Sequence, residues 1–201
     1  MARDLTSIVK RSRREGIALH PKAHKVLARR KAMPGEIAGS RRRKPTQYAR
    51  QLREKQKVKR LYGLLEKQFR RLIAEAIRAE GVTGELLLQY LERRLDNTVY
   101  RLHLAPSRQG ARQLVTHGHI LLNGRRVDIP SIRVKPGDEL AVRPKSQASS
   151  YFKELDFGSG QAASWLAFNK SKLSAKVTAL PPREEAEPEI AEQLIIEFYS
   201  R

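Results

Sequence analysis

Residues 91–130 read LERRLDNTVYRLHLAPSRQGARQLVTHGHILLNGRRVDIP, and the fold class can be read from them. Apolar residues first recur at helical spacing, and they recur again in a short helix that Ser107 can cap. Gly118 suits the left-handed residue that follows such a helix, and Asn123-Gly124 is a strong signal for a two-residue hairpin turn. The stretch therefore predicts two amphipathic helices that lead into an antiparallel hairpin.

The flanking sequence extends this α+β unit in both directions. Apolar spacing indicates one continuous helix from about Glu85 to Leu102, and residues 134–142 are typical of a turn followed by a strand. Residues 146–180 carry only a weak pattern of short apolar groups. We expect a small module with a short antiparallel sheet, which with its extension occupies residues 91–181.

A mainly helical domain is predicted ahead of the module, in residues 46–90. Thr46 is a suitable helix N-cap, and Gly63 marks a break between two helices. Apolar residues form one stripe of these helices, and basic residues fill the opposite face. The segment 182–201 ends in an apolar stretch that must pack against something, so we expect it to complete this domain.

Charge is distributed very unevenly along the chain. The 201 residues include 41 Lys and Arg against 21 Asp and Glu, a formal net charge of +20. Residues 1–71 hold 23 of these basic residues and 5 of the acidic ones, whereas residues 151–201 hold 6 and 8. This imbalance indicates a polyanionic partner that is contacted chiefly by the first third of the chain.

Residues 1–45 combine many charges with little periodicity, and proline and glycine interrupt them repeatedly. We expect an extended basic arm, with one short helical turn at most, whose order depends on a partner. A localisation-type basic patch and a disordered tail are the alternatives for this segment.

Several classes of protein are excluded. The chain has no cysteine, so it has neither disulfides nor cysteine-ligated zinc. No apolar run is long enough to cross a bilayer, and the first residues lack the apolar core of a secretory signal. We therefore expect an intracellular, cytoplasmic protein without a membrane partner.

No arrangement of residues suits catalysis. The sequence has neither a Gly-x-Ser-x-Gly elbow nor a glycine-rich phosphate loop, so we expect no enzyme, no cofactor and no small-molecule substrate. His117 and His119 lack a third metal ligand nearby, which leaves RNA contact or a turn-filling role. Asp96 is an isolated carboxylate that we expect to pair with a nearby arginine, such as Arg93 or Arg101, and not to act as a catalyst.

Basic and amide side chains gather around the short helix and the hairpin. Helix N-terminal amides and guanidinium groups both favour phosphate, although a merely solvated face is the alternative. The chain lacks the helix-turn-helix, finger and zipper patterns, so a folded RNA recognised by its shape is favoured over DNA. The candidate RNA contacts in the module are Arg108, Arg112, Gln113, His117, Asn123, Arg125 and Arg126. Those on the helical domain are Arg53, Lys55, Lys57, Lys59 and Arg70.

Five motifs in order along the chain resemble the bacterial type of the S-four family of small-subunit ribosomal proteins, whose S-four RNA-binding module matches the α+β unit. They are SRREG from Ser12, QLREKQKVKRLYGLLEKQFRRL from Gln51, LERRLDNTVYRL from Leu91, ARQLVTHGHILLNGRRVDIPS from Ala111, and EQLIIEFYSR at the C-terminus. Many members also carry an N-terminal cysteine cluster that binds zinc, which is absent here.

The resemblance implies a structural, non-enzymatic component of the small ribosomal subunit, in a cytoplasmic or an organellar ribosome. Such a protein is a primary binder of the 5′ domain of 16S ribosomal RNA and nucleates assembly of that domain. It lies beside proteins S-three and S-five at the messenger-RNA entry channel, and it contributes to translational accuracy with S-five. The candidate messenger contacts are Arg41, Arg42, Arg43, Lys44 and Arg50.

Two other functions were weighed against this one. An RNA-modifying enzyme such as a pseudouridine synthase can carry the same module, but the residues that follow the module here are too few for a catalytic domain. A non-ribosomal RNA chaperone or stress factor is the other alternative, and co-sedimentation with small subunits would separate it from a ribosomal protein.

Overall fold

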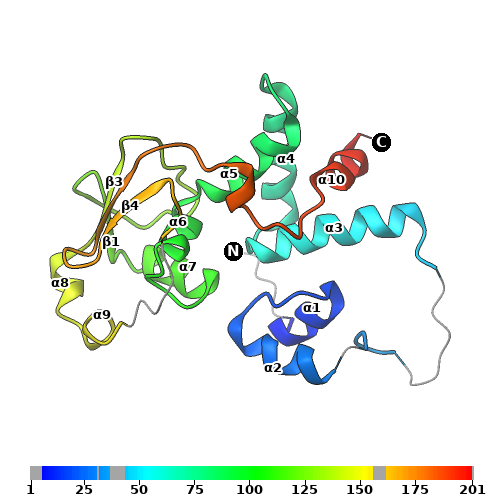
Figure 1. Cartoon of the computed structure of the whole chain (residues 1–201), viewed down its shortest axis with the longest axis horizontal. Coiled ribbons are helices and arrows are strands. Elements are labelled where there is room, and N and C mark those ends of the chain that lie inside the picture. Colours follow the sequence, from blue (N-terminus) through cyan, green and yellow to red (C-terminus); the bar gives the residue numbers. More distant parts are fainter. Residues whose placement is uncertain (1–5, 31, 37–43, 156–161, 201) are drawn as a thin grey trace. The chain divides into compact units, whose positions relative to one another are not determined.

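The computed structural model describes residues 6–30, 32–36, 44–155 and 162–200, and it is drawn in Figure 1. Helices and a five-stranded antiparallel sheet make it an α+β structure, which confirms the predicted class. The chain divides into two compact units. Met1–Ala74 and Glu189–Arg201 form one, called the helical unit below, and Glu75–Pro188 form the other, called the sheet unit. No described helix is both long and apolar enough to cross a membrane.

The helical unit is built from segments at both ends of the chain. Its elements are α1 Ile8–Glu15, α2 Pro21–Arg29, α3 Gln47–Leu61, most of α4 Glu66–Arg78, and α10 Glu192–Tyr199. The predicted cap of α3 is confirmed, because the Ala49 N–H donates to Thr46 Oγ1 at 3.2 Å. The predicted break is confirmed as well, since Gly63 lies between α3 and α4 with a positive φ of 62°.

The expectation of an extended N-terminal arm is wrong for residues 8–29, which form α1 and α2. Gly16 ends α1 in the left-handed conformation at φ 75°. Pro21 then opens α2, and the Lys22 N–H donates to the His20 side chain at 3.1 Å. These start and stop signals are local, but the density of charge and the lack of a long apolar stripe concealed them. Arg41, Arg42 and Arg43 lie outside the described residues.

A buried carboxylate joins α1 to α3. The Glu15 side chain is only 1% exposed, and it accepts hydrogen bonds from Arg53 at 3.3 Å and from Arg60. Burial raises the pKa of Glu15, and the two arginines oppose that rise. A charge-rich segment can therefore pack, because arginines of α3 neutralise the acid that α1 buries.

The C-terminal helix α10 packs on α3, as we expected for an apolar end segment. Gln51 Nε2 donates to Glu197 Oε2 at 2.8 Å, and the Lys55 ammonium lies 4.7 Å from the centre of the Phe198 ring. The Tyr199 hydroxyl donates to Glu66 Oε1 at 2.8 Å, at the start of α4. Residues 133 and 146 positions apart in sequence therefore share one packed surface.

The sheet unit contains helices on one side of an antiparallel sheet (Figure 1). Its elements are α5 Thr83–Glu92, α6 Leu95–Arg101, α7 Arg108–Thr116, β1 Ile120–Leu122, β2 Arg125–Val127, β3 Glu139–Val142, α8 Pro144–Gln147, α9 Ser150–Lys153, β4 Leu166–Asn169, β5 Ser174–Val177 and the short 3₁₀ helix η1 Arg183–Glu185. The strand order is β2-β1-β3-β5-β4. Residues from α6, α7 and the inner face of the sheet share one hydrophobic core.

The predicted short helix and hairpin are confirmed. The Gly110 N–H donates to the Ser107 hydroxyl at 3.2 Å, which caps α7, and Gly118 follows the helix at φ 71°. Asn123 and Gly124 both have positive φ, 51° and 76°, which a two-residue hairpin turn requires. The hairpin aligns Leu122 with Arg125 in register.

The single helix predicted for residues 85–102 is wrong, because α5 and α6 are separate. The chain leaves helical geometry between them to pair with a later segment. The Leu95 N–H donates to the Ile132 carbonyl at 2.8 Å, and the Val134 N–H donates to the Arg93 carbonyl at 2.9 Å. The weak pattern of residues 146–180 also concealed two strands, β4 and β5, the second of which pairs with β3.

Glu66 gives a test of how α10 is held. Burial acts to raise the pKa of Glu66, but hydrogen bonds from Lys55, Lys59 and Tyr199 outweigh it and lower the pKa to about 2. Because the unfolded pKa is about 4.3, this pairing stabilises the fold above that pH, and the contribution is lost as pH falls toward 2. We expect Glu66→Gln to remove a pH-dependent contribution of roughly 1 kcal/mol, an allowance for screening included, since the side chain is 40% exposed.

Urea unfolding measured between pH 2.5 and 6.5 tests this expectation. The free energy of unfolding of Glu66→Gln should change less over that range than that of the wild type. Glu189→Gln is the matched control, because the Glu189 side chain is exposed and only its backbone carbonyl is bonded to Lys57. Parallel pH profiles for Glu66→Gln and the wild type would contradict the role given to Glu66.

Candidate nucleic-acid interface

Carboxylates in the sheet unit neutralise most arginines of its helices. Glu92 is buried, and it accepts hydrogen bonds from Nε and Nη2 of Arg101 at 2.8 and 2.9 Å. Arg108 Nη2 donates to Glu187 at 2.6 Å. Charge-assisted pairs of this kind satisfy the guanidinium group within the protein. A cation held in this way has less to gain from an external phosphate.

Arg112 is also held by an acid of the sheet unit. Its Nε lies 2.8 Å from Oδ2 of Asp96, a buried carboxylate that also accepts from Arg94 at 3.1 and 3.0 Å. The expectation that Asp96 pairs with a nearby arginine is confirmed, but its partners are Arg94 and Arg112 and not the two arginines named as examples. Arg93 instead donates to the Val134 carbonyl at 2.8 Å, and Arg101 binds Glu92.

Helix α7 divides the candidate contacts between two faces. Arg108 and Arg112 are four residues apart and both bind groups of α6, Asn97 and Asp96 respectively. Gln113 and His117 are also four residues apart, and both are exposed. A step of one residue turns a helix by about 100°, so neighbouring positions such as 112 and 113 face different surroundings.

The hairpin likewise carries one side chain that is hydrogen-bonded within the protein and two that are exposed to solvent. The Asn123 side chain donates to Asp138 at 2.9 Å and accepts from the Glu139 N–H at 2.8 Å, so it ties the turn to the start of β3. Arg125 and Arg126 of β2 are exposed, and neither forms an ion pair with a described residue. These two arginines are the clearest candidates for phosphate contacts in the sheet unit.

His119 lies among positive groups. Its Nδ1 is 2.9 Å from the Ser146 hydroxyl, and its ring centre is 6.0 Å from that of His117. Burial lowers the pKa of His119, and repulsion from His117, Arg143 and Arg126 lowers it further. No carboxylate contributes to this shift, which distinguishes the surroundings of His119 from those of Arg112.

Exposure of the basic side chains of α3 was expected, and the structure contradicts it for several of them. Lys55 is only 5% exposed and donates to Glu66, as does Lys59, while Lys57 donates to the Glu189 carbonyl at 2.6 Å. Because α3 packs on both α1 and α10, its basic side chains lie close to carboxylates of the same unit. Three other candidate contacts of the helical unit are exposed: Lys44 just before α3, Arg50 in α3 and Arg70 in α4. RNA contact remains a prediction for all these residues, including Arg53, which is paired with Glu15.

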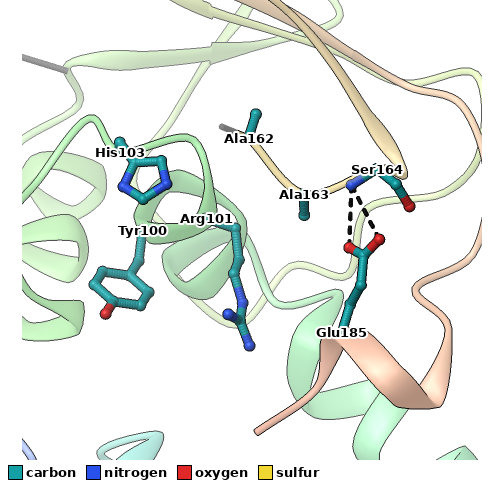
Figure 2. A pocket seen from close by; sticks show the side chains of 7 residues that line it. All are labelled: Tyr100, Arg101, His103, Ala162, Ala163, Ser164 and Glu185. Atoms are coloured by element: carbon teal, nitrogen blue, oxygen red, sulfur yellow. Dashed lines mark hydrogen bonds between the residues drawn. The ribbon is translucent and has the colours of Figure 1, made fainter. Parts of the chain in front are cut away.

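A hollow of about 430 Å³ opens in the sheet unit, and Figure 2 shows the side chains that line it. They are Tyr100, Arg101, His103, Ala162, Ala163, Ser164 and Glu185. Both Glu185 carboxylate oxygens accept from the Ser164 N–H, at 3.2 and 3.1 Å, and Arg101 is bound to Glu92. The two charged side chains that line the hollow, Glu185 and Arg101, therefore bind groups of the protein itself. Among the described residues no three His, Asp or Glu side chains form a group suited to a metal ion.

Two helices that lead into an arginine-bearing hairpin and a small sheet define an S4-domain protein. Residues 93–140 match the S4 domain, and residues 4–92 match the ribosomal protein S4/S9 N-terminal domain. The chain aligns over its whole length, and over the whole of each relative, with the small ribosomal subunit protein uS4 of Chloroflexus aurantiacus at 54% identity, of Chlorobaculum tepidum at 51% and of Halothermothrix orenii at 50%. The chain belongs to the small ribosomal subunit protein uS4 family, whose members are structural proteins and not enzymes, and the resemblance inferred from the motifs is confirmed.

The two classes of arginine should respond differently to substitution. Arg112→Ala leaves buried Asp96 with one cation fewer, so we expect it to lower the free energy of unfolding of the sheet unit by about 1–3 kcal/mol. Arg125→Ala should change it by no more than about 0.5 kcal/mol, since the side chain is exposed and forms no ion pair within the described part of the chain. Urea unfolding followed by fluorescence of Trp165, the single tryptophan and a buried residue of this unit, measures both changes. Equal losses in the two variants would refute the division into paired and open arginines.

Proposed function

We propose that this protein binds ribosomal RNA in the small subunit through phosphate contacts, and that Arg125 and Arg126 are central to them. The observation that carries this proposal is that neither has a carboxylate partner among the described residues, in a unit where several other arginines have one. An open guanidinium group gains strong charge-assisted hydrogen bonds when it meets a phosphate. His117 and Gln113 on the exposed face of α7 add further polar contacts.

The helical unit supplies a second part of the RNA surface. Arg50 and Arg70 are exposed on α3 and α4, and Lys44 is exposed just before α3. The basic excess of residues 1–71 favours the same unit. Several cations of α3 already form hydrogen bonds with acids or carbonyl groups of the helical unit. The RNA contacts of this unit therefore come from the exposed cations and from residues that change partners on binding.

Membership of the family and these surfaces support a finer role. The RNA target is the 5′ domain of 16S ribosomal RNA, and binding to it nucleates assembly of that domain. The protein then lies near the messenger-RNA entry channel beside proteins S-three and S-five, where Arg41, Arg42, Arg43, Lys44 and Arg50 approach the message. Its contribution to translational accuracy is shared with S-five. The family of its full-length relatives and its net charge of +20 support this role.

Binding to an isolated 16S 5′-domain transcript, titrated across salt, tests the RNA contacts. Each phosphate contact that is lost should reduce the slope of log K against log salt by about 1. We therefore expect Arg125→Ala/Arg126→Ala to weaken binding and to reduce the slope by up to about 2. A folded RNA of equal length and scrambled sequence serves as competitor and separates specific from general affinity.

The matched control is Lys172→Ala/Lys176→Ala, which removes the same charge from the other end of the sheet. Lys172 follows β4, the edge strand opposite β2, and Lys176 lies in β5; both side chains are exposed. A control that reduces the slope as much as the arginine pair does would show that only net charge matters. Co-sedimentation of the wild type with small subunits then distinguishes a ribosomal protein from a free RNA chaperone.

A further inference from the structure

In the sheet unit, two arginines and two histidines lie close together, and no described acid pairs with any of them. His117 follows α7, Arg126 lies in β2, and Arg143 follows β3; all three act on His119 at the start of β1. None of these four residues forms an ion pair with a described residue. His119 also contacts two uncharged groups, the Ser146 hydroxyl of α8 and the Phe152 ring of α9. We call these four residues the His119 cluster.

Gly118 allows the cluster to close over the backbone. A Cβ atom built at Gly118 would lie 2.6 Å from Nη2 of Arg126, closer than such atoms approach in proteins. The guanidinium group of Arg126 therefore covers the glycine directly, at the point where the chain turns from α7 into β1. His117 and His119 are the residues on either side of Gly118, and their ring centres are 6.0 Å apart.

His119 is oriented for one further contact. Its Nδ1 is engaged by the Ser146 hydroxyl at 2.9 Å, and its ring lies edge-on to Phe152 with the centres 6.2 Å apart. Nε2 forms no hydrogen bond with a described residue. In the imidazolium form both ring nitrogens donate, so Nε2–H can then serve an anion while Nδ1–H keeps the bond to Ser146.

We propose that the His119 cluster binds one phosphate group, a phosphodiester of the RNA backbone, and that His119 takes up a proton when it binds. This inference rests on the proposed RNA-binding function and adds a site and a proton linkage to it. The bound anion offsets the repulsion that His117, Arg126 and Arg143 exert on a protonated His119. Binding and protonation therefore favour each other.

The direction of the pH effect follows from that coupling. Burial and the surrounding cations lower the pKa of His119 in the free protein, and a phosphate raises it again. The complex thus holds more protons than the free protein at a pH between the two values, so affinity increases as pH falls. A single titrating group can change affinity by at most about tenfold per pH unit.

The first arm of the test uses inorganic phosphate and the intact chain. NMR signals of the histidine Cε1–H groups, followed from pH 5 to 8.5, give the pKa of each histidine. We expect phosphate to raise the pKa of His119 beyond any change caused by sodium chloride at equal ionic strength. Arg126→Gln should raise the pKa of His119 without phosphate, by removing repulsion, and should reduce the further response to phosphate. A response that chloride reproduces in full would overturn the site.

The second arm uses the 16S 5′-domain transcript, with affinity measured from pH 5.5 to 8. The wild type should bind about three- to tenfold more tightly at the lower pH. His119→Asn should lose that gain, because its amide can keep a bond to Ser146 but cannot titrate. His103→Asn is the control, since His103 is exposed and has a φ of 56°, which asparagine adopts readily.

The two arms separate failure of the inference from failure of the proposed function. Specific RNA binding with the same pH dependence in the wild type and in His119→Asn would overturn the linkage and leave RNA binding in place. A response to inorganic phosphate together with that result would limit the cluster to free phosphate and overturn its use for RNA. Loss of specific RNA binding by the wild type at every pH would instead contradict the proposed function itself. If His119→Asn does not fold, Arg126→Gln tests the linkage instead. It should bind the transcript more weakly at every pH and gain less affinity as pH falls, because His119 is less repelled in the free variant.

Discussion

Neutralisation of arginine and lysine by a small number of buried or half-buried carboxylates is the interaction on which the structure depends. A chain with a net charge of +20 repels itself, and a charge placed inside a protein is costly unless it is paired. Glu15 holds two arginines of α3, Asp96 holds Arg94 and Arg112, and Glu92 holds Arg101. The acids thereby determine which helices can approach one another.

The same pairing determines where the protein can bind a polyanion. Cations that hold helices together are less available to phosphate, and cations without an acid remain open to it. In the sheet unit the arginines of α6 and α7 belong to the first class, and Arg125, Arg126 and Arg143 belong to the second. The core of α6, α7 and the sheet supports both classes, since it fixes the helix face that carries Arg112 and the strand that carries Arg126.

Local signals explain what could be predicted. Ser107, Gly63 and the Asn123-Gly124 turn were assigned correctly, because a cap, a break or a tight turn depends on the backbone of a few adjacent residues. The α+β class followed from hydrophobic periodicity for the same reason. The prediction failed where distant segments compete for the backbone, as at Arg93, where pairing with residues 132–134 ends α5. It failed also for α1, which is charged along its length and is stabilised by arginines far along the chain.

The amino-acid sequence was sufficient to predict the family, the α+β class, the basic character and the set of candidate RNA contacts. These follow from composition and from motifs whose order is visible in one dimension. Which of those candidates form ion pairs with a carboxylate became clear only from the folded chain. Arg108 meets Glu187, 79 residues away, and Gln51 meets Glu197, 146 residues away. Ion pairing depends on distances in space, so residues that look equivalent in the sequence become either internal supports or open contacts once the chain has folded.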